Sequence, residues 1–535
     1  MMRMTGRWSS SAQLVAALML ALCLQAGAAA AQELRIAMKG EVDNADPHQS
    51  YTPNRMVQLH VFETLLTQDE HLRPHPGLAL SWRATDPMTW EFTLRPGVRF
   101  HDGSALTPAD VAFSIMRAKA ATGVRTYAAA VRNVALVEPT GEHTFLIHTR
   151  EPAPLQPAYL VSVAIVSARA AEGATGLDWN GGRAAVGTGP YRWIKWRQGQ
   201  DVVLDRNPDY WGEKEPWERV TFRFISNDGA RAAALLAGDV DVADTLPAEL
   251  YDRVRESTGI KLITANSIFT NYLYIDSLSA STPNATGLDG QALPKNPLGD
   301  HRVRQAMDHA LNRVALADRA MQGGGTAAGQ IAAPGLIGHV PGLEPARYDP
   351  ALSKKLLAEA GYPQGFNLAL SCTNDRFAGD SRTCQAVAQM LNAVGIHVKV
   401  EALPMAIYAR RWATIGPSGS SDFSATISMF GSTSGLASEG MNTILRTANP
   451  ERGYGASNRH FVSDATLDAK LAAVDGTFDD AERERLTQDA VRYAMGQEVV
   501  LPLFFVKASW GLRRDLTLLP RGDQYTLAMT VRKAP

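Results

Sequence analysis

The chain has 535 residues, with 53 basic and 54 acidic side chains and a formal net charge of −1. This balance argues against a nucleic-acid-binding protein, because phosphate binding favours a net basic surface. No long tract of one charge sign or of low complexity occurs. We therefore expect a folded protein without disordered tails.

The first 31 residues have the composition of a secretory signal peptide. Arg3 and Arg7 precede an apolar run of 11 residues, Leu14 to Leu24, and the small residues Ala29 to Ala31 allow cleavage before Gln32. The run is too short to span a membrane, which takes about 20 apolar residues. We expect export, cleavage and a soluble mature protein located in the periplasm.

Cys23 raises the alternative of a lipoprotein, but Leu22 precedes it where lipid attachment requires a small residue. Cleavage after residue 31 leaves 504 residues, with 51 basic against 54 acidic side chains and a net charge of −3. At about 150 residues per domain, this length predicts roughly three compact units.

Two adjoining segments, WEFTLRPGVRFHDG from Trp90 to Gly103 and TPADVAFSIMRA from Thr107 to Ala118, combine local signals that agree. Apolar and polar residues alternate at the start of the first segment, which predicts a strand with one buried face. Pro-Gly and Asp-Gly pairs then predict turns. In the second segment the threonine can cap a helix, and the aspartate three residues later faces the helix dipole.

These two segments resemble the fingerprint of the family 5 periplasmic solute-binding proteins, the dipeptide, oligopeptide and nickel receptors of ABC importers. Three further blocks follow in family order: Gly187 to Gly212, His301 to Arg313, and Asp349 to Phe366. The resemblance covers about Asp43 to Leu512. It implies a receptor that closes on a solute and delivers it to permease subunits in the inner membrane.

The first part of the chain, Glu33 to about Thr188, alternates short strand patterns with turns and has further helical stretches near Arg55 and Val161. A hairpin follows, with strands Tyr191 to Trp196 and Val202 to Leu204.

Two strand-helix-strand units follow later in the chain. The first consists of Val220 to Ile225, a helix from Asp228 that Gly238 can stop, and Val240 to Ala243. The second consists of Phe366 to Ser371, a helix from Asp380 to Val394 that ends at Gly395, and Ile396 to Leu403. Crossovers of this length usually join parallel strands, so two α/β lobes are expected.

Between these units we expect two helices. One is expected from Val303 to Arg319, with Val303, Met307, Ala310, Leu311 and Val314 on one face, and the other from Asp349-Pro350 to Gly361.

The predicted fold class is α/β, of the type II periplasmic-binding-protein kind, with two α/β lobes, a two-segment hinge and an extra strand-rich subdomain in the first lobe. In such a family the chain passes to the second lobe and back, and we place the crossings near Thr264 to Asp276 and Leu501 to Trp510. The expected divisions are these: signal peptide 1–31, lobe I 32–265 with the subdomain at about 66–186, lobe II 266–502, and a C-terminal return 503–535.

Cys372 and Cys384 are the cysteines of the mature chain. In an oxidising periplasm we expect a disulfide that closes a loop of about a dozen residues and contributes about 3 kcal/mol. Two buried free thiols are the alternative. A metal site is not expected, because no further ligands cluster near the cysteines.

Catalytic and cofactor motifs are weak. Gly431 to Gly435, GSTSG, has the spacing of a nucleophile elbow but carries Thr433 where serine is expected, so we interpret it as a polar loop. Gly323, Gly325 and Ala328 match a dinucleotide fingerprint by spacing alone, since they follow a predicted helix rather than a strand. We expect neither an enzyme nor a cofactor.

Ligands of open α/β sheets collect beyond the carboxyl ends of the strands. The loop that begins at Cys372 resembles the dipeptide-receptor segment whose arginine holds the peptide carboxylate, and Arg376 is the matching position. A guanidinium can grip a carboxylate with two hydrogen bonds. The alternative is a salt bridge of Arg376 to Asp375 or Asp380.

A second loop follows the predicted strand Phe423 to Met429. Peptide-binding relatives carry an aspartate there for the free amino group, whereas this chain has Ser432, Thr433 and Ser434, which offer hydroxyls without charge. Glu439 could substitute, and an aspartate introduced at either serine is expected to favour free amines. The loop also lacks the histidine expected of a nickel receptor.

Lobe I is expected to contribute His48 and Tyr51, from a loop that resembles the family's first cleft-facing segment, either as ligand contacts or as residues that pin the loop. Trp193, Trp196 and Trp211 are expected to pack in cores, whereas Trp412 and Trp510 are undecided.

The sequence thus predicts a monomeric receptor for a small peptide or a peptide-like solute with a carboxylate, without nucleic-acid partners. An opine, a sugar conjugate or another polar metabolite is the alternative solute. A secreted hydrolase and a chemosensory or chaperone role are the remaining alternatives.

Overall fold

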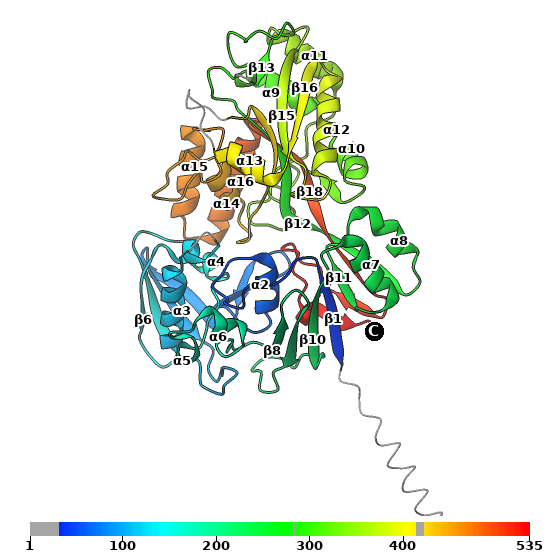
Figure 1. The fold of residues 1–535 in the computed structure, drawn as a ribbon. Coiled ribbons are helices and arrows are strands. Elements are labelled where there is room, and N and C mark those ends of the chain that lie inside the picture. Colours follow the sequence, from blue (N-terminus) through cyan, green and yellow to red (C-terminus); the bar gives the residue numbers. More distant parts are fainter. Residues whose placement is uncertain (1–31, 123–124, 283, 414–421) are drawn as a thin grey trace, which may run out of the picture.

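The computed structural model describes residues 32–122, 125–282, 284–413 and 422–535. Two groups of elements are joined by two long strands, β12 (Ile260–Ile275) and β18 (Val500–Arg513) (Figure 1). We call the elements before β12 and after β18 lobe I, and those between them lobe II. The predicted signal peptide lies outside the described residues, and no helix within them is long and apolar enough to span a membrane.

One twelve-stranded sheet extends through both lobes in the order β13-β15-β17-β12-β18-β11-β1-β10-β9-β8, with β16 beside β15 and β14 beside β18. Its lobe I strands are β1 (Glu33–Met38), β8 (Tyr191–Arg197), β9 (Asp201–Arg206), β10 (Arg219–Phe224) and β11 (Val242–Asp244). Its lobe II strands are β13 (Ala285–Thr286), β14 (Gly325–Ala327), β15 (Phe366–Thr373), β16 (Ile396–Leu403) and β17 (Ala425–Gly431).

The pairing of β12 with β18 is interrupted where the chain passes between the lobes. The antiparallel register runs to Asn266 opposite Lys507 and resumes at Thr270 opposite Phe505, so that the intervening residues of β12 form a bulge. Ser267 Oγ donates to the Val506 carbonyl at 2.8 Å and accepts the Phe269 N–H at 3.2 Å. The bulge is therefore a hydrogen-bonded feature that bends the strand at the crossing.

The lobe I part of the sheet contains the first predicted strand-helix-strand unit. It consists of β10, α7 (Asp228–Ala237) and β11, and Gly238 ends the helix with a φ of 77°. Both strands run parallel to β1, which lies between them. The hairpin of β8 and β9 is also present as predicted.

A separate four-stranded sheet, in the order β4-β5-β7-β6, forms the strand-rich part of lobe I together with α3 (Pro108–Ala120). Its strands are β4 (Ala79–Asp86), β5 (Thr89–Leu94), β6 (Val134–Pro139) and β7 (Thr144–Thr149). Trp90, Phe92 and Leu94 of β5 are buried, as the alternation predicts. Thr107 occupies the N-cap position of α3 as expected, and its N–H and hydroxyl both donate to the Asp110 carboxylate, at 3.0 and 2.6 Å, which is the aspartate half of a capping box.

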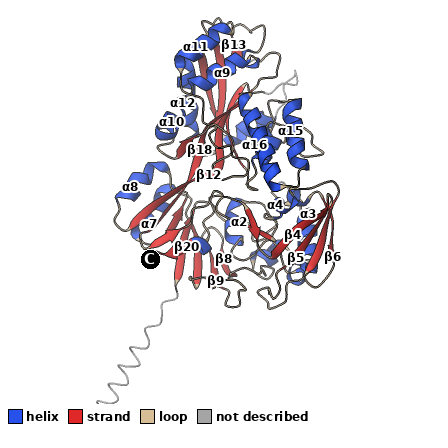
Figure 2. Cartoon of the chain, turned by 180° about the vertical axis from the view of Figure 1, so that it is seen from behind, coloured by secondary structure: helices blue, strands red, loops and turns tan. Residues whose placement is uncertain are grey.

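The remaining elements of lobe I are short, and one of them, α2, lies between these two sheets (Figure 2). They are α2 (Thr52–Gln58), β2 (Leu66–Gln68), β3 (Pro74–Pro76), α4 (Gln156–Leu160), α5 (Ala168–Ala171), α6 (Gly176–Asn180), α8 (Tyr251–Glu256), β19 (Leu516–Leu518) and β20 (Val531–Lys533).

Lobe II contains the second predicted unit, in which β15 and β16 pair in parallel and α12 (Asp380–Asn392) connects them. Its other helices are α9 (His301–Ala310), α10 (Arg313–Ala315), α11 (Pro350–Glu359), α13 (Met405–Ala413), α14 (Ala437–Ile444), α15 (Ala465–Gly476) and α16 (Asp480–Gly496). Asp349 caps α11 as predicted, because its carboxylate accepts the Leu352 N–H at 2.9 Å. The two lobes have separate hydrophobic cores.

The predicted continuous helix from Val303 to Arg319 is wrong. The α9 helix ends at Ala310, and Asn312 Oδ1 accepts the Ala315 N–H at 2.9 Å, so it caps a new short helix. A π-helical turn follows over Leu316–Ala320. The break changes the direction of the chain, and Val314, expected on the buried face, is 62% exposed.

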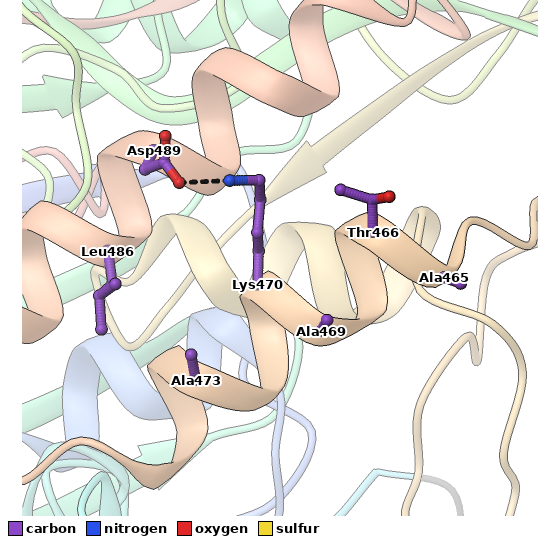
Figure 3. A pocket seen from close by; sticks show the side chains of 7 residues that line it. All are labelled: Ala465, Thr466, Ala469, Lys470, Ala473, Leu486 and Asp489. Carbon is purple, nitrogen blue, oxygen red and sulfur yellow. Dashed lines mark hydrogen bonds and ion pairs between the residues drawn. The ribbon is translucent and has the colours of Figure 1, made fainter.

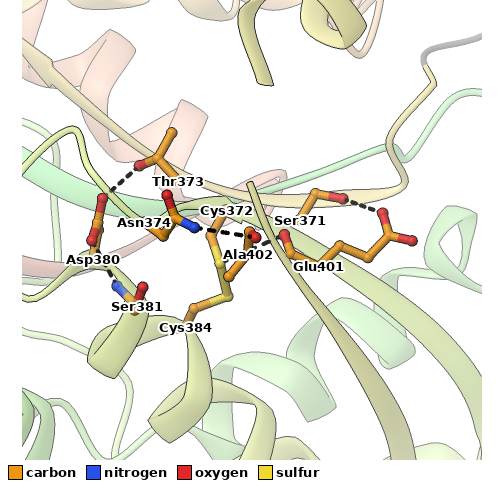
Figure 4. The surroundings of a disulfide bond; sticks show 9 residues. All are labelled: Ser371, Cys372, Thr373, Asn374, Asp380, Ser381, Cys384, Glu401 and Ala402. Carbon is orange, nitrogen blue, oxygen red and sulfur yellow. Dashed lines mark hydrogen bonds between the residues drawn. A yellow bond between two sulfur atoms is a disulfide. The ribbon is translucent and has the colours of Figure 1, made fainter. Parts of the chain in front are cut away.

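Cys372 and Cys384 form the expected disulfide, which joins the end of β15 to α12 (Figure 4). The Cα atoms are 6.4 Å apart and both side chains are buried. The bond closes the loop that carries Arg376, so it constrains the predicted ligand-binding segment.

We predict that the double variant Cys372→Ser, Cys384→Ser is less stable by about 3 kcal/mol, because the unfolded chain regains the entropy of the open loop. Thermal unfolding with and without reductant would measure this loss. The reductant should lower the melting temperature of the wild type and leave that of the double variant unchanged. Equal melting temperatures of the oxidised wild type and the variant would contradict the prediction.

Candidate ligand-binding site between the lobes

Three neighbouring cavities lie between the lobes. The first, which we call the hinge cavity, has a volume of about 280 Å³ and adjoins β12 and β18. Its lining includes Tyr251, Phe269, Arg376, Phe377, Lys507 and Trp510. The middle cavity of about 190 Å³ is lined by residues that include Tyr51, Arg55, Gln68, Tyr127, Thr433 and Tyr525. The outer cavity of about 390 Å³ has Tyr127, Tyr159, Thr433, Ser434, Glu439 and Asp475 among its lining residues.

Two larger depressions lie on lobe II alone. One, of about 720 Å³, adjoins α12, and the other, of about 560 Å³, lies between α15 and α16. Small side chains line much of the latter, and its Lys470 and Asp489 pair with each other (Figure 3). Because neither depression contacts both lobes, the seam between the lobes is the candidate site.

Arg376 reaches the hinge cavity from the loop between β15 and α12. The two carboxylates proposed as alternative partners hold the loop instead. Asp380 accepts the Thr373 hydroxyl at 2.9 Å and the Arg376 backbone N–H at 3.0 Å, and Asp375 accepts the Met405 N–H at 2.7 Å.

The guanidinium of Arg376 is exposed and has neither a hydrogen-bond nor an ion-pair partner within the described ranges. Residues outside those ranges include no aspartate or glutamate. The salt bridge that the sequence left open is therefore not formed, and a full positive charge faces the cavity.

The serine loop is organised around Glu439, in the first turn of α14. Ser432 Oγ donates to Glu439 Oε2 at 2.6 Å, Ser434 Oγ donates to the same oxygen, and both serines are 5% exposed. Thr433 is exposed between them, and its carbonyl accepts the Gln68 amide of lobe I at 3.2 Å. The two serines thus fix a carboxylate at the wall of the outer cavity.

The GSTSG segment ends in a tight contact rather than a nucleophile elbow. Gly435 has a φ of 77°, and a Cβ atom there would lie 2.8 Å from the Leu72 carbonyl of lobe I. Leu72 lies in the turn between β2 and β3 and packs with Ile268 and Phe505 of the crossing strands and with Leu336 of lobe II. This apolar cluster holds the serine loop against lobe I.

The structure places His48 in the interior rather than on a cavity wall. His48 Nε2 donates to the Ala164 carbonyl at 2.9 Å, and Arg117 donates to its Nδ1 at 2.8 Å. Burial lowers the pKa of His48 to about 4, which matches this neutral form. Burial would raise the pKa of Asp46, yet the Arg117 guanidinium holds it below the usual range. This arrangement favours pinning of the loop.

Tyr51, by contrast, lines the middle cavity, where the Arg125 guanidinium lies 4.9 Å from the centre of its ring. Tyr127 and Tyr525 line the same cavity. The lobe I wall of the seam is therefore rich in phenol groups that can donate or accept hydrogen bonds.

Trp193, Trp196 and Trp211 pack against hydrophobic cores, as predicted. Trp412 stacks on Tyr408 within lobe II, with ring centres 5.3 Å apart. Trp510 is 1% exposed and lines the hinge cavity.

Lys507 is a cavity residue that the motif analysis missed. It is the one charged residue between Val499 and Leu512 of the sequence, inside an otherwise apolar strand. A lone charge in a buried strand is the signal that could have indicated it. Tyr127, Tyr525 and Gln68 carry no comparable local signal.

Within the described parts of the chain, no group of three or more His, Cys, Asp and Glu side chains is arranged to hold a metal ion. The seam offers instead unpaired charges, phenols and hydroxyls, which can bind a polar organic solute.

Known proteins resemble this chain over most of its length. The glutathione-binding protein GsiB of Salmonella typhi is 26% identical over 498 residues, which is 92% of either chain. The structure of HbpA2 from Haemophilus parasuis has a TM-score of 0.80 at 22% identity and covers 94% of this chain and 100% of its own. DppA from Helicobacter pylori in complex with the peptide STSA has a TM-score of 0.70 at 20% identity, covering 94% and 98%.

The structural likeness shows the two-lobed α/β fold of type II periplasmic binding proteins. Residues 73–451 match the middle region of the bacterial extracellular solute-binding proteins, family 5. The chain therefore belongs to family 5 of the bacterial extracellular solute-binding proteins, the solute receptors of ABC importers.

Proposed function

We propose that this receptor captures a small peptide or peptide-like solute with a free carboxylate between its lobes and delivers it, unchanged, to an inner-membrane permease. The observation that carries the proposal is the unpaired Arg376 guanidinium in the hinge cavity. In a closed cleft such a group can bind a carboxylate with two parallel hydrogen bonds. We further propose that the receptor acts as a monomer in the periplasm after cleavage of its leader.

A negative pole at the opposite end of the seam supports a peptide-like solute. Glu439 lines the outer cavity, and its Oε2 is held by Ser432 and Ser434. Among the described residues no hydrogen bond occupies Oε1. A carboxylate oriented in this way can bind an ammonium group, so we propose Glu439 in place of the family's aspartate. A zwitterion with separated charges fits both poles.

The middle cavity would hold the polar backbone of the solute. Tyr51 and Thr433 line it from opposite lobes, so a solute there contacts both lobes. A solute with contacts to both lobes shifts the equilibrium toward the closed receptor. The divisions at residues 265 and 502 would then mark the parts that move.

Relatives supply the probes for a test. GsiB is named for glutathione, and the DppA structure contains a peptide. Glutathione and a set of tripeptides should raise the free energy of unfolding by about 2.7 kcal/mol at a hundredfold excess over the dissociation constant. Mass spectrometry should recover them unchanged. The absence of stabilisation by every probe, or turnover of a bound one, would overturn the proposal.

Arg376→Ala should weaken binding of these probes about tenfold to a hundredfold, because a hydrogen-bonded charge contact is lost. The melting temperature of the free protein should stay unchanged, since the guanidinium has no partner among the described residues. Calorimetric titration measures the affinity, and Arg253→Ala on exposed α8 is the matched control. Wild-type affinity in Arg376→Ala would exclude the carboxylate contact.

Glu439→Gln should weaken peptides with a free amine about tenfold and leave N-acetylated peptides unaffected, because only the ammonium needs the charge. Ser434→Asp should not improve binding, contrary to the expectation from sequence, because its carboxylate would face Glu439 and repel it. Titration of paired free and acetylated tripeptides tests both. Equal losses of affinity for the free and the acetylated peptides would mean that Glu439 only stabilises the serine loop.

A further inference from the structure

The hinge cavity contains more positive than negative charge. Its lining includes four basic side chains, Lys39, Arg376, Arg382 and Lys507, and two acidic ones, Asp228 and Glu249. Net charge in a partly enclosed space attracts counter-charge from solution. The pairing of these groups decides which charges are available to a solute.

Both acidic groups of the cavity are already paired. Asp228 accepts Lys39 Nζ at 3.3 Å and Arg231 Nη2 at 2.6 Å, while Glu249 pairs with Arg382 at 2.7 Å. Asp228 is thus paired within lobe I, whereas Glu249 pairs with Arg382 of α12 across the seam. No free carboxylate is therefore left in the lining of the cavity for the two remaining cations, Arg376 and Lys507.

Lys507 is the second unbalanced cation beside Arg376. Its Nζ donates to the Gly323 carbonyl at 3.1 Å, and no carboxylate pairs with it anywhere in the described ranges. An ammonium group has three donors, so two remain for a solute. The residue lies on β18 at the end of the regular register, opposite Asn266, where the two lobes meet.

We propose that Lys507 is a second anion-binding residue of the hinge cavity, and that the solute end bound there carries two anionic groups. This inference rests on the proposed function, since it specifies the solute of the same site. Two cations left uncompensated in a closed cleft would oppose closure, whereas two anionic groups balance them. Sites for whole drug-sized ligands measure about 300–1,000 Å³. A cavity of about 280 Å³ therefore suits an end group.

The second anion can be a carboxylate or a phosphate, and matched tripeptides separate these sources. We would titrate Ala-Ala-Glu against Ala-Ala-Gln, and Ala-Ala-phosphoserine against Ala-Ala-Ser. The wild type should bind Ala-Ala-Glu or Ala-Ala-phosphoserine about tenfold more tightly than the partner whose side chain is uncharged, by analogy with other charged hydrogen bonds. The advantage should shrink as salt increases.

Variants at Lys507 test the residue itself. Lys507→Gln keeps a donor for Gly323 but removes the charge, so it should abolish the advantage by weakening the peptides that carry the second anionic group. Lys507→Arg should retain most of the advantage. Lys354→Gln, which removes an exposed positive charge from α11, is the matched control and should behave as the wild type.

The outcomes separate this inference from the proposed function. If the charged and neutral peptides bind the wild type equally, the inference fails and the receptor function stands. If Lys507→Gln weakens all four peptides alike, Lys507 has a structural role and the inference also fails. If neither these four peptides nor glutathione binds, the proposed function itself fails. Loss of the advantage in the glutamate pair would identify the second anion as a carboxylate, and loss in the phosphoserine pair would identify it as a phosphate.

Discussion

The pairing of β12 with β18 is the constraint on which the remaining structure depends. Each strand belongs to both lobes, so a single hydrogen-bonded ladder connects the main hydrophobic cores of the two lobes. The bulge at Ser267 interrupts the ladder between the lobes and is itself held by hydrogen bonds. The relative position of the lobes is therefore set by a few residues, and the seam beside them becomes the place where a solute can influence it.

The charges of the seam are distributed unevenly between the two lobes. Lobe II supplies Arg376 at one end and Glu439 at the other, each held by neighbours that leave its charge available. Lobe I supplies mainly phenols and internally paired ions. This division means that lobe II orients a solute by charge, while lobe I closes over its polar middle.

Local patterns predicted much of the fold because they depend on neighbours in sequence. The alternation in β5, the cap at Thr107 and both strand-helix-strand units are of this kind. The helix after Val303 was predicted too long, because Asn312 interrupts an apolar pattern that extends across it. Helical periodicity cannot detect such a side-chain cap.

The residues of the candidate site could be predicted from the sequence only in loops that resemble ligand-binding segments of the family. Arg376 follows a strand end, and its free charge became evident once Asp375 and Asp380 were seen to bind the backbone. The environment of Lys507 depends on which distant segments meet, because its partner Gly323 is far away in the sequence. Glu439, by contrast, bonds to serines only five and seven residues before it. The burial of His48 likewise depends on Arg117, far away in the sequence.

The position of Leu72 has a consequence for the solute-free protein. Its backbone has a φ of 61°, and its side chain is fully buried among residues of the crossing strands and lobe II. Parting the lobes would expose that side chain to water at a cost of about 1.5–3 kcal/mol. This contact favours the joined arrangement of the lobes independently of the solute. A transporter that sensed only contact between the two lobes would therefore also respond to receptors without a solute.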